Sequence, residues 1–216
     1  KKEAGKLENF NISVAIDENF MLAVENDREI ELVNPRSKQV VRRVRAREVF
    51  DSMCQCAWET GDPGYVVIDR INASSSNPTP ALGEIESTNP CGEQPLLPYE
   101  PCNLGSINLS KFVRDGKVDW DFLSEAVQLS IHFLDNVIDV NNYPLPEIEA
   151  IAKGNRRIGL GIMGWGEMLA QLGIAYDSDQ ATKLAEQTMK FINNAALKSS
   201  EELAVARGVF PNFRNS

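Results

Sequence analysis

The sequence predicts an α/β protein, and three observations support this. Short β-branched or alternating segments recur along the chain, amphipathic helical patterns follow them, and turn-forming residues separate the two. Helices that alternate with short strands are typical of α/β architecture. The chain has 216 residues, 43% of them hydrophobic. A chain of this size can bury one sizeable core, which corresponds to roughly one or two domains.

The first elements lie in the N-terminal quarter of the chain. Residues Phe10–Ile16 alternate apolar and small polar side chains, which predicts a short strand. An acidic surface excursion that ends near Pro35 follows it. From Arg47 to Thr60 apolar residues recur at three and four positions. This spacing predicts an amphipathic helix with Cys54 on its apolar stripe.

A turn and a second strand follow this helix. Gly61-Asp62-Pro63-Gly64 ends the helix, and the β-branched run Tyr65–Ile68 predicts a buried strand. Residues 72–110 then show no sustained period and are rich in Pro, Ser, Asn and Gly. A structureless stretch of this length is usually functional or disordered. It holds two of the four cysteines, Cys91 and Cys102.

The C-terminal half is predicted to be largely helical. Asp119 offers an N-cap to a helix that reaches about Val140, and two neighbouring sets of apolar positions on it predict burial on more than one side. The glycine-rich run Arg157–Gly164 leads into a helix that ends near Leu172. A long helix is then expected over Asp179–Ala206.

Composition excludes several classes of function. The chain carries 31 acidic and 22 basic residues, and its net charge of -9 argues against a nucleic-acid polymer as partner. Small phosphorylated ligands stay possible, because a few local donors are enough to hold them. Apolar stretches fall short of the ~20 residues of a membrane span, and Lys1–Gly5 lacks the apolar core of a secretory signal. We therefore expect a cytoplasmic protein without a membrane partner.

The loop cysteines are the first candidates for chemistry. Cys91 and Glu93 place a thiol and a carboxylate two residues apart in a loop bracketed by proline and glycine, and a thiol near a base is a recurring reactive pair. Asn89 can donate and accept hydrogen bonds, and Cys102 follows Cys91 by eleven positions. Two thiols near one carboxylate suggest redox chemistry. On spacing alone, the alternative that both cysteines are simply buried in a turn is favoured over a redox site, because free cysteines are among the most buried residue types.

Longer runs around these residues carry a family resemblance. The motif Asn89-Pro90-Cys91-Gly92-Glu93 and the short gap to Cys102 resemble the active-site finger loop of ribonucleotide reductases, most closely that of the adenosylcobalamin-dependent class. The similarity spans nearly all of residues 7–213. The segments that carry it, in order, are residues 58–64, 69–72, 87–96, 99–109, 133–139 and 156–164.

The resemblance implies a role for each loop residue. Cys91 would become the thiyl radical that removes the ribose 3′-hydrogen, and Glu93 would be the base on the 3′-hydroxyl. Asn89 would hold the ribose hydroxyls, and Cys102 would be one of two reducing cysteines. The implied cofactor is adenosylcobalamin. The implied partners are a ribonucleoside di- or triphosphate, an external dithiol reductant such as thioredoxin, and the remainder of the catalytic subunit.

The resemblance also implies a fold. Residues 1–216 would be a partial catalytic barrel domain, truncated at both ends relative to the family, with the finger loop at about 72–112. They would form part of a ten-stranded α/β barrel with the finger loop at its centre. A chain this short is expected to be inactive alone, and a catalytically silent structural fragment is the alternative. No role is assigned to Cys54 or Cys56.

A nicotinamide-dinucleotide site is the first rival interpretation. Gly159-x-Gly161-x-x-Gly164 fits the dinucleotide fingerprint, and Asp177 and Asp179 follow near the right distance. The fingerprint needs an apolar strand directly before its first glycine, and this chain has Ala152–Arg157 there. The resemblance instead places these glycines in a barrel strand, where small side chains allow close packing.

A zinc site is the second rival. Neither Cys54 with Cys56 nor Cys91 with Cys102 has the spacing of a metal knuckle. The single histidine, His132, falls within the apolar helix, where it is expected to be packed or partly exposed.

Overall fold

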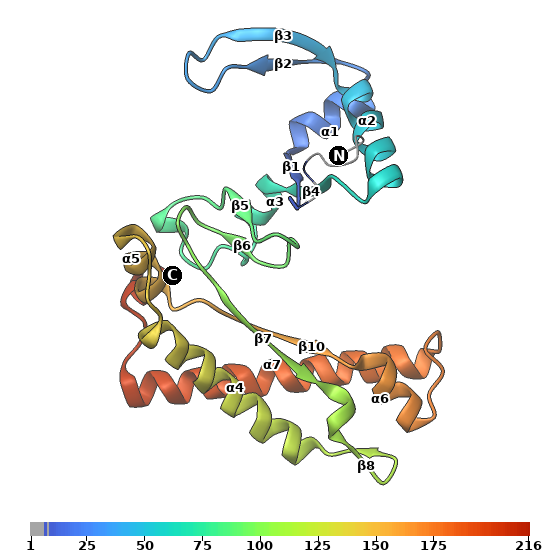
Figure 1. The fold of residues 1–216 in the computed structure, drawn as a ribbon, viewed down its shortest axis with the longest axis vertical. Helices are drawn as coiled ribbons and strands as arrows, with labels where there is room; N and C mark the ends of the chain where they lie inside the picture. The colour runs from blue at the N-terminus through green and yellow to red at the C-terminus, as the bar shows by residue number, and fades with distance from the viewer. Residues whose placement is uncertain (1–6, 8) are drawn as a thin grey trace. The chain divides into compact units, whose positions relative to one another are not determined.

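The structure is a computed structural model that describes residue 7 and residues 9–216. The chain divides into two compact units, one formed by Lys1–Pro98 with Ser216 and the other by Tyr99–Asn215. Each unit has its own parallel strand pair, which Figure 1 shows as β1 with β4 and as β7 with β10.

The described residues of the first unit form three small strand pairs and three α-helices. Its elements, in order, are β1 Ser13–Ile16, α1 Glu18–Glu25, β2 Glu29–Val33, β3 Val40–Arg45, α2 Ala46–Thr60, β4 Gly64–Val67, α3 Ile68–Ala73, the 3₁₀ turn η1 Pro80–Leu82, β5 Ser87–Thr88 and β6 Pro95–Leu96. Strands β1 and β4 pair in parallel, from Ser13 opposite Gly64 to Ile16 opposite Val67. The predicted first strand is thus confirmed in its second half.

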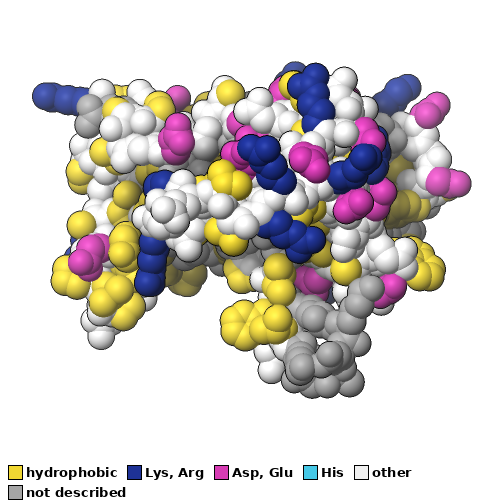
Figure 2. Space-filling model, turned by 90° about the horizontal axis from the view of Figure 1, so that it is seen from above, with side chains coloured by type: hydrophobic (Ala, Val, Ile, Leu, Met, Phe, Trp, Pro, Cys, Tyr) yellow, Lys and Arg dark blue, Asp and Glu magenta, His cyan; other side chains and the backbone are white. Residues whose placement is uncertain are grey.

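The acidic segment before Pro35 is not the surface excursion that the sequence suggested. Asp17 caps α1 by accepting a hydrogen bond from the Phe20 backbone amide at 2.7 Å. The antiparallel hairpin of β2 and β3 follows, with a cross-strand ion pair of 2.6 Å between Arg43 and Glu31. Glutamates alternate with Ile and Leu along β2, and three arginines stand among the valines of β3, so this charge masked the strand pattern. Figure 2 shows basic and acidic side chains intermixed on the face that it presents.

Helix α2 confirms the helix predicted over Arg47–Thr60, but its burial differs from the prediction. The buried cluster of this unit, Ala23, Val24 and Ala46, includes the first residue of α2 and packs against Phe50 one turn later. The later turns are more open, so Cys54 is exposed and Trp58 is 83% exposed. The half-buried side of α2 in these turns carries Met53, Cys56 and Ala57, so the prediction that Cys54 lies on the apolar stripe was wrong. Strand β4 is likewise confirmed as a strand, although Tyr65 in it is exposed rather than buried.

The second unit consists of a parallel strand pair with long helices packed against it. Its elements, in order, are β7 Asn103–Asn108, the 3₁₀ turn η2 Leu109–Phe112, β8 Val113–Arg114, β9 Lys117–Val118, α4 Trp120–Val140, α5 Pro146–Asn155, β10 Ile158–Met163, α6 Trp165–Leu172, α7 Asp179–Arg207 and the 3₁₀ turn η3 Pro211–Asn215. Strands β7 and β10 pair in parallel over six residues, from Asn103 opposite Ile158 to Asn108 opposite Met163.

One core holds this unit together. Its central side chains are fully buried, and burying a Leu or Met contributes roughly 1.5–3 kcal/mol each. They come from the end of β7, from η2, from one stripe of α4, and from α6 and α7: Ile107, Leu109, Phe112, Leu123, Val127, Ile131, Met168 and Ile192. The core therefore fixes β7 between α4 and the C-terminal helices.

Helix α4 confirms the predicted helix and its cap. The Asp119 carboxylate accepts a hydrogen bond from the Phe122 backbone amide at 3.0 Å. One apolar stripe is buried in this unit, and it includes Leu123 and Leu134. The second apolar set is not, since Leu129 is 70% and Phe133 is 64% exposed. Burial of α4 on more than one side was therefore a wrong prediction for this unit.

Two elements of the second unit were missed from the sequence. Strand β7 lies inside the stretch 72–110 that was expected to be structureless, and its Asn, Gly and Ser residues have low strand propensity. Its partner β10 supplies the pairing that the local sequence does not predict. Helix α5 begins at Pro146 without a side-chain cap and was also missed. Helices α6 and α7 confirm the two helices predicted after Gly164.

The α/β class is confirmed, but the ten-stranded barrel is not. Among the described residues all sheets are two-stranded pairs, and none closes on itself. The β7–α4–α5–β10 segment does form a parallel crossover, the unit from which α/β barrels are built.

Candidate active site

The candidate radical cysteine lies in a tight turn between β5 and β6. These strands pair antiparallel, with Ser87 opposite Leu96 and Thr88 opposite Pro95. Two hydrogen bonds close the turn at its base. The Asn89 amide donates to the Gln94 carbonyl at 3.1 Å, and the Gln94 amide donates to Asn89 Oδ1 at 3.0 Å.

Pro90 and Gly92 explain the shape of the turn tip. The Gly92 amide donates to the Asn89 carbonyl at 3.1 Å, which makes Asn89 the first residue of a β-turn. Proline is favoured at the second position of such turns and glycine at the fourth. Gly92 has a φ of +86°, a conformation in which other residues are strained. The local sequence alone therefore predicts a tight turn around Cys91.

The turn presents the thiol and the carboxylate together. Cys91 and Glu93 are exposed, whereas Asn89 is half-buried. Because the Asn89 side-chain oxygen is used inside the turn, its amide nitrogen is the group available to a ligand. The structure thus brings Cys91 and Glu93 onto one short loop, as expected, and gives Asn89 a structural role that the sequence did not predict.

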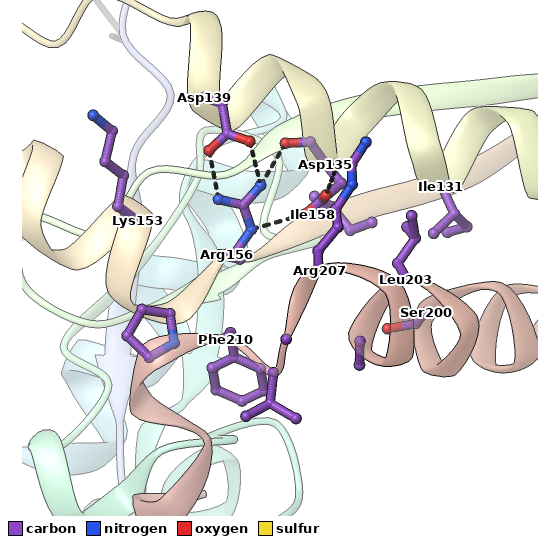
Figure 3. Close-up of a pocket in the computed structure, with 14 residues that line it drawn as sticks. Ile131, Asp135, Asp139, Lys153, Arg156, Ile158, Ser200, Leu203, Arg207 and Phe210 are labelled. Atoms are coloured by element: carbon purple, nitrogen blue, oxygen red, sulfur yellow. Dashed lines mark hydrogen bonds and ion pairs between the residues drawn. The ribbon is translucent and has the colours of Figure 1, made fainter.

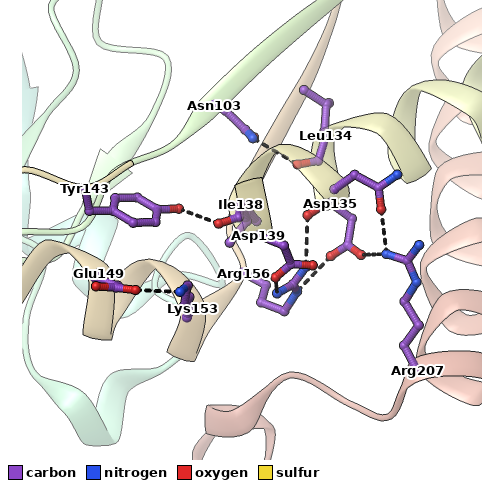
Figure 4. Close-up of polar contacts among 11 residues, drawn as sticks. Asn103, Leu134, Asp135, Ile138, Asp139, Tyr143, Glu149, Lys153, Arg156 and Arg207 are labelled. Atoms are coloured by element: carbon purple, nitrogen blue, oxygen red, sulfur yellow. Dashed lines mark hydrogen bonds and ion pairs between the residues drawn. The ribbon is translucent and has the colours of Figure 1, made fainter. Parts of the chain in front are cut away.

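Cys102 belongs to the second unit, immediately before β7. It is half-buried, and its sulfur lies 3.5 Å from the carbonyl oxygen of Asn103. The next side chain, Asn103, donates to the Leu134 carbonyl on α4 at 2.9 Å, as Figure 4 shows. Strand β6 separates Cys102 from the Cys91 turn along the chain. The convergence of Cys91, Glu93 and Cys102 on one space remains a prediction.

A buried acid next to Cys102 was missed from the sequence. The Glu100 side chain is completely buried, and its carboxylate lies 3.1 Å from Arg157 Nη1. Its other oxygen accepts a hydrogen bond of 2.7 Å from the Asn155 side chain. Glu100 and Arg157 are 57 positions apart. A local sequence pattern carries no signal for a pair at this separation.

A second charged cluster joins the ends of α4, α5 and α7. Arg156 donates to Asp135 at 2.8 Å and to Asp139 at 2.6 Å, and Arg207 donates to Asp135 at 2.6 Å (Figure 3). The Arg156 hydrogen bond lowers the pKa of Asp139, and the same bond raises the pKa of Arg156. His132 Nε2 lies 2.6 Å from Arg207 Nη2.

This cluster lines a cavity with a volume of about 470 Å³. Its charges are already compensated within the protein. We therefore interpret the cluster as a connection between helices rather than as a ligand site. His132 is exposed on α4, which is more open than the packed or partly exposed position predicted for it.

The dinucleotide interpretation of the glycine run is wrong. Gly159 and Gly161 lie inside strand β10, whereas the fingerprint needs its first glycine in the turn after a strand. The turn falls at Gly164, with a φ of +73°. A Cβ on Gly161 would lie 3.5 Å from the Ser106 hydroxyl, which is an ordinary van der Waals distance, so this contact with β7 does not require a glycine.

Two further findings concern metals and membranes. Within residue 7 and residues 9–216, no three His, Cys, Asp or Glu side chains come together in a way that would hold a metal ion. Over the same residues, no helix combines the length and apolar character needed to cross a membrane.

Comparison with known proteins places these observations in context. The family described as "Ribonucleotide reductase, barrel domain" matches residues 1–216. A vitamin B12-dependent ribonucleoside-diphosphate reductase of Thermoplasma acidophilum is 50% identical over 211 residues, which are 97% of this chain and 27% of that protein. A reductase of the same name from Mycobacterium tuberculosis is 51% identical, over 98% of this chain and 30% of its own length.

A more distant relative shows the same correspondence. The ribonucleoside-diphosphate reductase subunit alpha of Chlamydia pneumoniae is 34% identical over 182 residues, which are 82% of this chain and 17% of that subunit. The chain thus spans less than a third of the length of these relatives.

Proposed function

The chain belongs to the ribonucleotide reductase family, as part of its barrel domain, and we propose that it carries the radical site of an enzyme that reduces ribonucleoside diphosphates. The turn Asn89–Gln94 is the observation that supports this most directly, since it carries a thiol and a carboxylate two residues apart on a loop closed by hydrogen bonds. Both relatives near 50% identity have the diphosphate in their names, which favours it over the triphosphate.

The proposed reaction gives each residue one task. Cys91, as a thiyl radical, takes the 3′-hydrogen of the ribose, and the Glu93 carboxylate accepts the proton of the 3′-hydroxyl. The resulting ribosyl radical expels the 2′-hydroxyl, which leaves as water after taking up a proton. The thiol of Cys102 and a second protein thiol supply two electrons and two protons as they close to a disulfide. Glu93 returns its proton to the 3′-oxygen, and Cys91 finally returns the hydrogen atom to C3′.

Asn89 contributes binding and orientation in this scheme. Its side-chain oxygen closes the turn, so its amide nitrogen is the group that would donate to a ribose hydroxyl. Holding the ribose within reach of Cys91 converts the hydrogen transfer into an effectively unimolecular step.

The relatives are named for vitamin B12, and we propose adenosylcobalamin as the cofactor of the complete enzyme. Such a cofactor supplies the radical chemistry when bound. The residues that the structure describes do not fit a site for it. The only histidine of the sequence contacts Arg207, and the two arginines that line the 470 Å³ cavity, Arg156 and Arg207, are both paired with Asp135. We therefore assign no residue of this chain to the cofactor.

An external dithiol reductant of the thioredoxin type would reopen the disulfide that Cys102 forms. This partner follows from the redox balance of the proposed reaction, because each turnover consumes two thiols. The ribonucleotide and the remainder of the catalytic subunit complete the set of proposed partners.

The proposal is tested with cysteine variants made in the native polypeptide that contains these residues. Cys91→Ser should abolish both exchange of the 3′-hydrogen and product formation, because the O–H bond of serine is too strong to form the needed radical. Cys102→Ser should preserve exchange but release free base and decomposed sugar. Cys54→Ser is the matched control, since Cys54 is exposed on α2, and it should behave like the wild type.

The outcomes also decide between the proposal and a catalytically silent structural segment. A silent segment predicts that Cys91→Ser and Cys102→Ser alter activity only in proportion to any loss of folded protein. Identical product distributions for these two variants would contradict the roles proposed here.

A further inference from the structure

The segment that carries Cys102 is held by a buried ionic contact which the proposed reaction does not explain. Glu100 lies two residues before Cys102, and its side chain has no exposed surface. Burying a carboxylate is unfavourable unless charged and hydrogen-bonding partners compensate it. Here Arg157 and Asn155 each contact one of the two carboxylate oxygens.

A further side chain extends this contact. Asn212 in η3 donates a hydrogen bond of 2.8 Å to the Asn155 side-chain oxygen. Gly154 leaves room for it, because a Cβ there would lie 2.5 Å from the Asn212 side-chain nitrogen. We use the term Glu100 clamp for Glu100, Asn155, Arg157 and Asn212. The clamp connects the end of α5, the start of β10 and η3 to the chain that enters β7.

The Glu100 clamp lies just before the point where β7 and β10 begin to pair. The ladder of β7 and β10 begins with Asn103 opposite Ile158. Arg157 comes one residue before this point and Glu100 three residues before it, so the clamp fixes the chain where backbone pairing has not yet begun. Cys102 is thereby held on both sides, by the clamp before it and by the Asn103 contact with α4 after it.

Arg157 also connects the clamp directly to the surroundings of the thiol. Cys102, Arg157 and Tyr143 line one small cavity of about 90 Å³. Because Arg157 is paired with Glu100, a shift of the Glu100 carboxylate should move a side chain that lines the same cavity as Cys102.

From these contacts we propose that Glu100 is a positioning residue for Cys102, and this proposal rests on the reducing role given to Cys102 above. A buried ion pair usually adds little stability compared with apolar packing, but it favours one arrangement over others. Disulfide closure also requires one defined arrangement, because the two Cα atoms must lie about 4.4–6.8 Å apart and the bond accepts only a narrow dihedral range. The clamp sets the starting position of one of the two thiols.

Glu100→Asp in the native polypeptide tests the proposal. This variant keeps the charge and the pairing with Arg157, but it withdraws the carboxylate by one methylene. We expect exchange of the 3′-hydrogen to stay within about twofold of wild type, while deoxynucleotide formation falls ~10- to 100-fold and base release rises, since a misplacement of about 1 Å has effects of this size.

A second measurement needs no substrate. The rate at which iodoacetamide alkylates Cys102, followed by peptide mass spectrometry, should change several-fold in Glu100→Asp, while the rate at Cys91 stays unchanged. Glu149→Asp is the matched control, because Glu149 forms an exposed pair with Lys153 on α5. It should alter neither the product ratio nor the alkylation rates. If Glu100→Asp does not fold, Arg157→Lys tests the same contact from its other side.

Two results would overturn the proposal. One is an equal fall of exchange and product together with a lower melting temperature, which would make Glu100 a purely structural residue. The other is an unchanged product ratio with unchanged alkylation of Cys102. Failure of the proposed function looks different, because Cys91→Ser would then retain exchange. In that case the alkylation rates still show whether Glu100 positions Cys102.

Discussion

The turn at Gly164 allows a quantitative test of how β10 is joined to α6. Gly164 has a φ of +73°, and a Cβ at this position would overlap the side-chain oxygen of Asn108. That oxygen caps η2, where it accepts hydrogen bonds from the Ser110 amide at 3.2 Å and from the Ser110 hydroxyl at 2.8 Å. Gly164→Ala should therefore both strain the backbone and displace a cap.

The magnitude follows from adding these two effects. The left-handed conformation costs a residue with a Cβ roughly 1–2 kcal/mol, and loss of a capping side chain costs about 1 kcal/mol. The expected loss in the free energy of unfolding is about 2–3 kcal/mol. With a urea m-value of about 2 kcal/mol/M, the unfolding midpoint should fall by roughly 1–1.5 M.

Two glycines nearby provide matched controls, with unfolding in urea followed by tryptophan fluorescence. Gly173 has a φ of +67° but open space where a methyl group would stand, so Gly173→Ala should lose only about 1–2 kcal/mol. Gly166 lies within α6 with open space, so Gly166→Ala should gain roughly 0.5–1 kcal/mol. If Gly164→Ala were no more destabilising than Gly173→Ala, the contact with Asn108 would not exist.

Three other predictions follow from the site and the core. In the native polypeptide, Glu93→Gln keeps the size of the side chain but removes the base, so deoxynucleotide formation should fall ~10²- to 10⁴-fold in a turnover assay; unchanged turnover would remove Glu93 from the mechanism. Leu123→Ala empties a fully buried position and should cost about 2–5 kcal/mol in urea unfolding, whereas Leu129→Ala, at a site 70% exposed, should stay within about 0.5 kcal/mol. The pKa of Asp139 is lowered by Arg156, so its contribution to stability is present above its ordinary pKa of 3.8 and is lost as the pH falls through the lower folded value. Asp139→Asn should thus cost at most about 1 kcal/mol at neutral pH, because the side chain is half exposed, and the difference from wild type should vanish in acid; a difference that grew in acid would contradict this.

The helices were predictable because their signals are local. Asp119 caps α4 and Ser178 caps α7, because the side-chain oxygen of each accepts a hydrogen bond from the backbone amide three positions later. Both helices also follow a clear apolar period. Strand β7 offered no such signal, because its Asn-Leu-Gly-Ser run becomes a strand only when β10 pairs with it. The exposed second face of α4 was unpredictable for a similar reason, since apolar spacing does not reveal which of two faces has a partner.

The two cysteines of the proposed reaction show the same division between local and distant control. Cys91 is placed by its neighbours, since Asn89, Pro90 and Gly92 shape the turn without help from distant residues. A short motif is therefore enough to identify it. Cys102 is placed by Glu100, whose partners lie more than fifty positions away. In a reaction that uses both thiols, the position of Cys91 should therefore be insensitive to substitutions elsewhere in the chain, whereas the position of Cys102 should change with them. Substitutions of Asn155 in α5 or of Asn212 in η3 should therefore act on the reduction step and leave hydrogen abstraction at Cys91 intact.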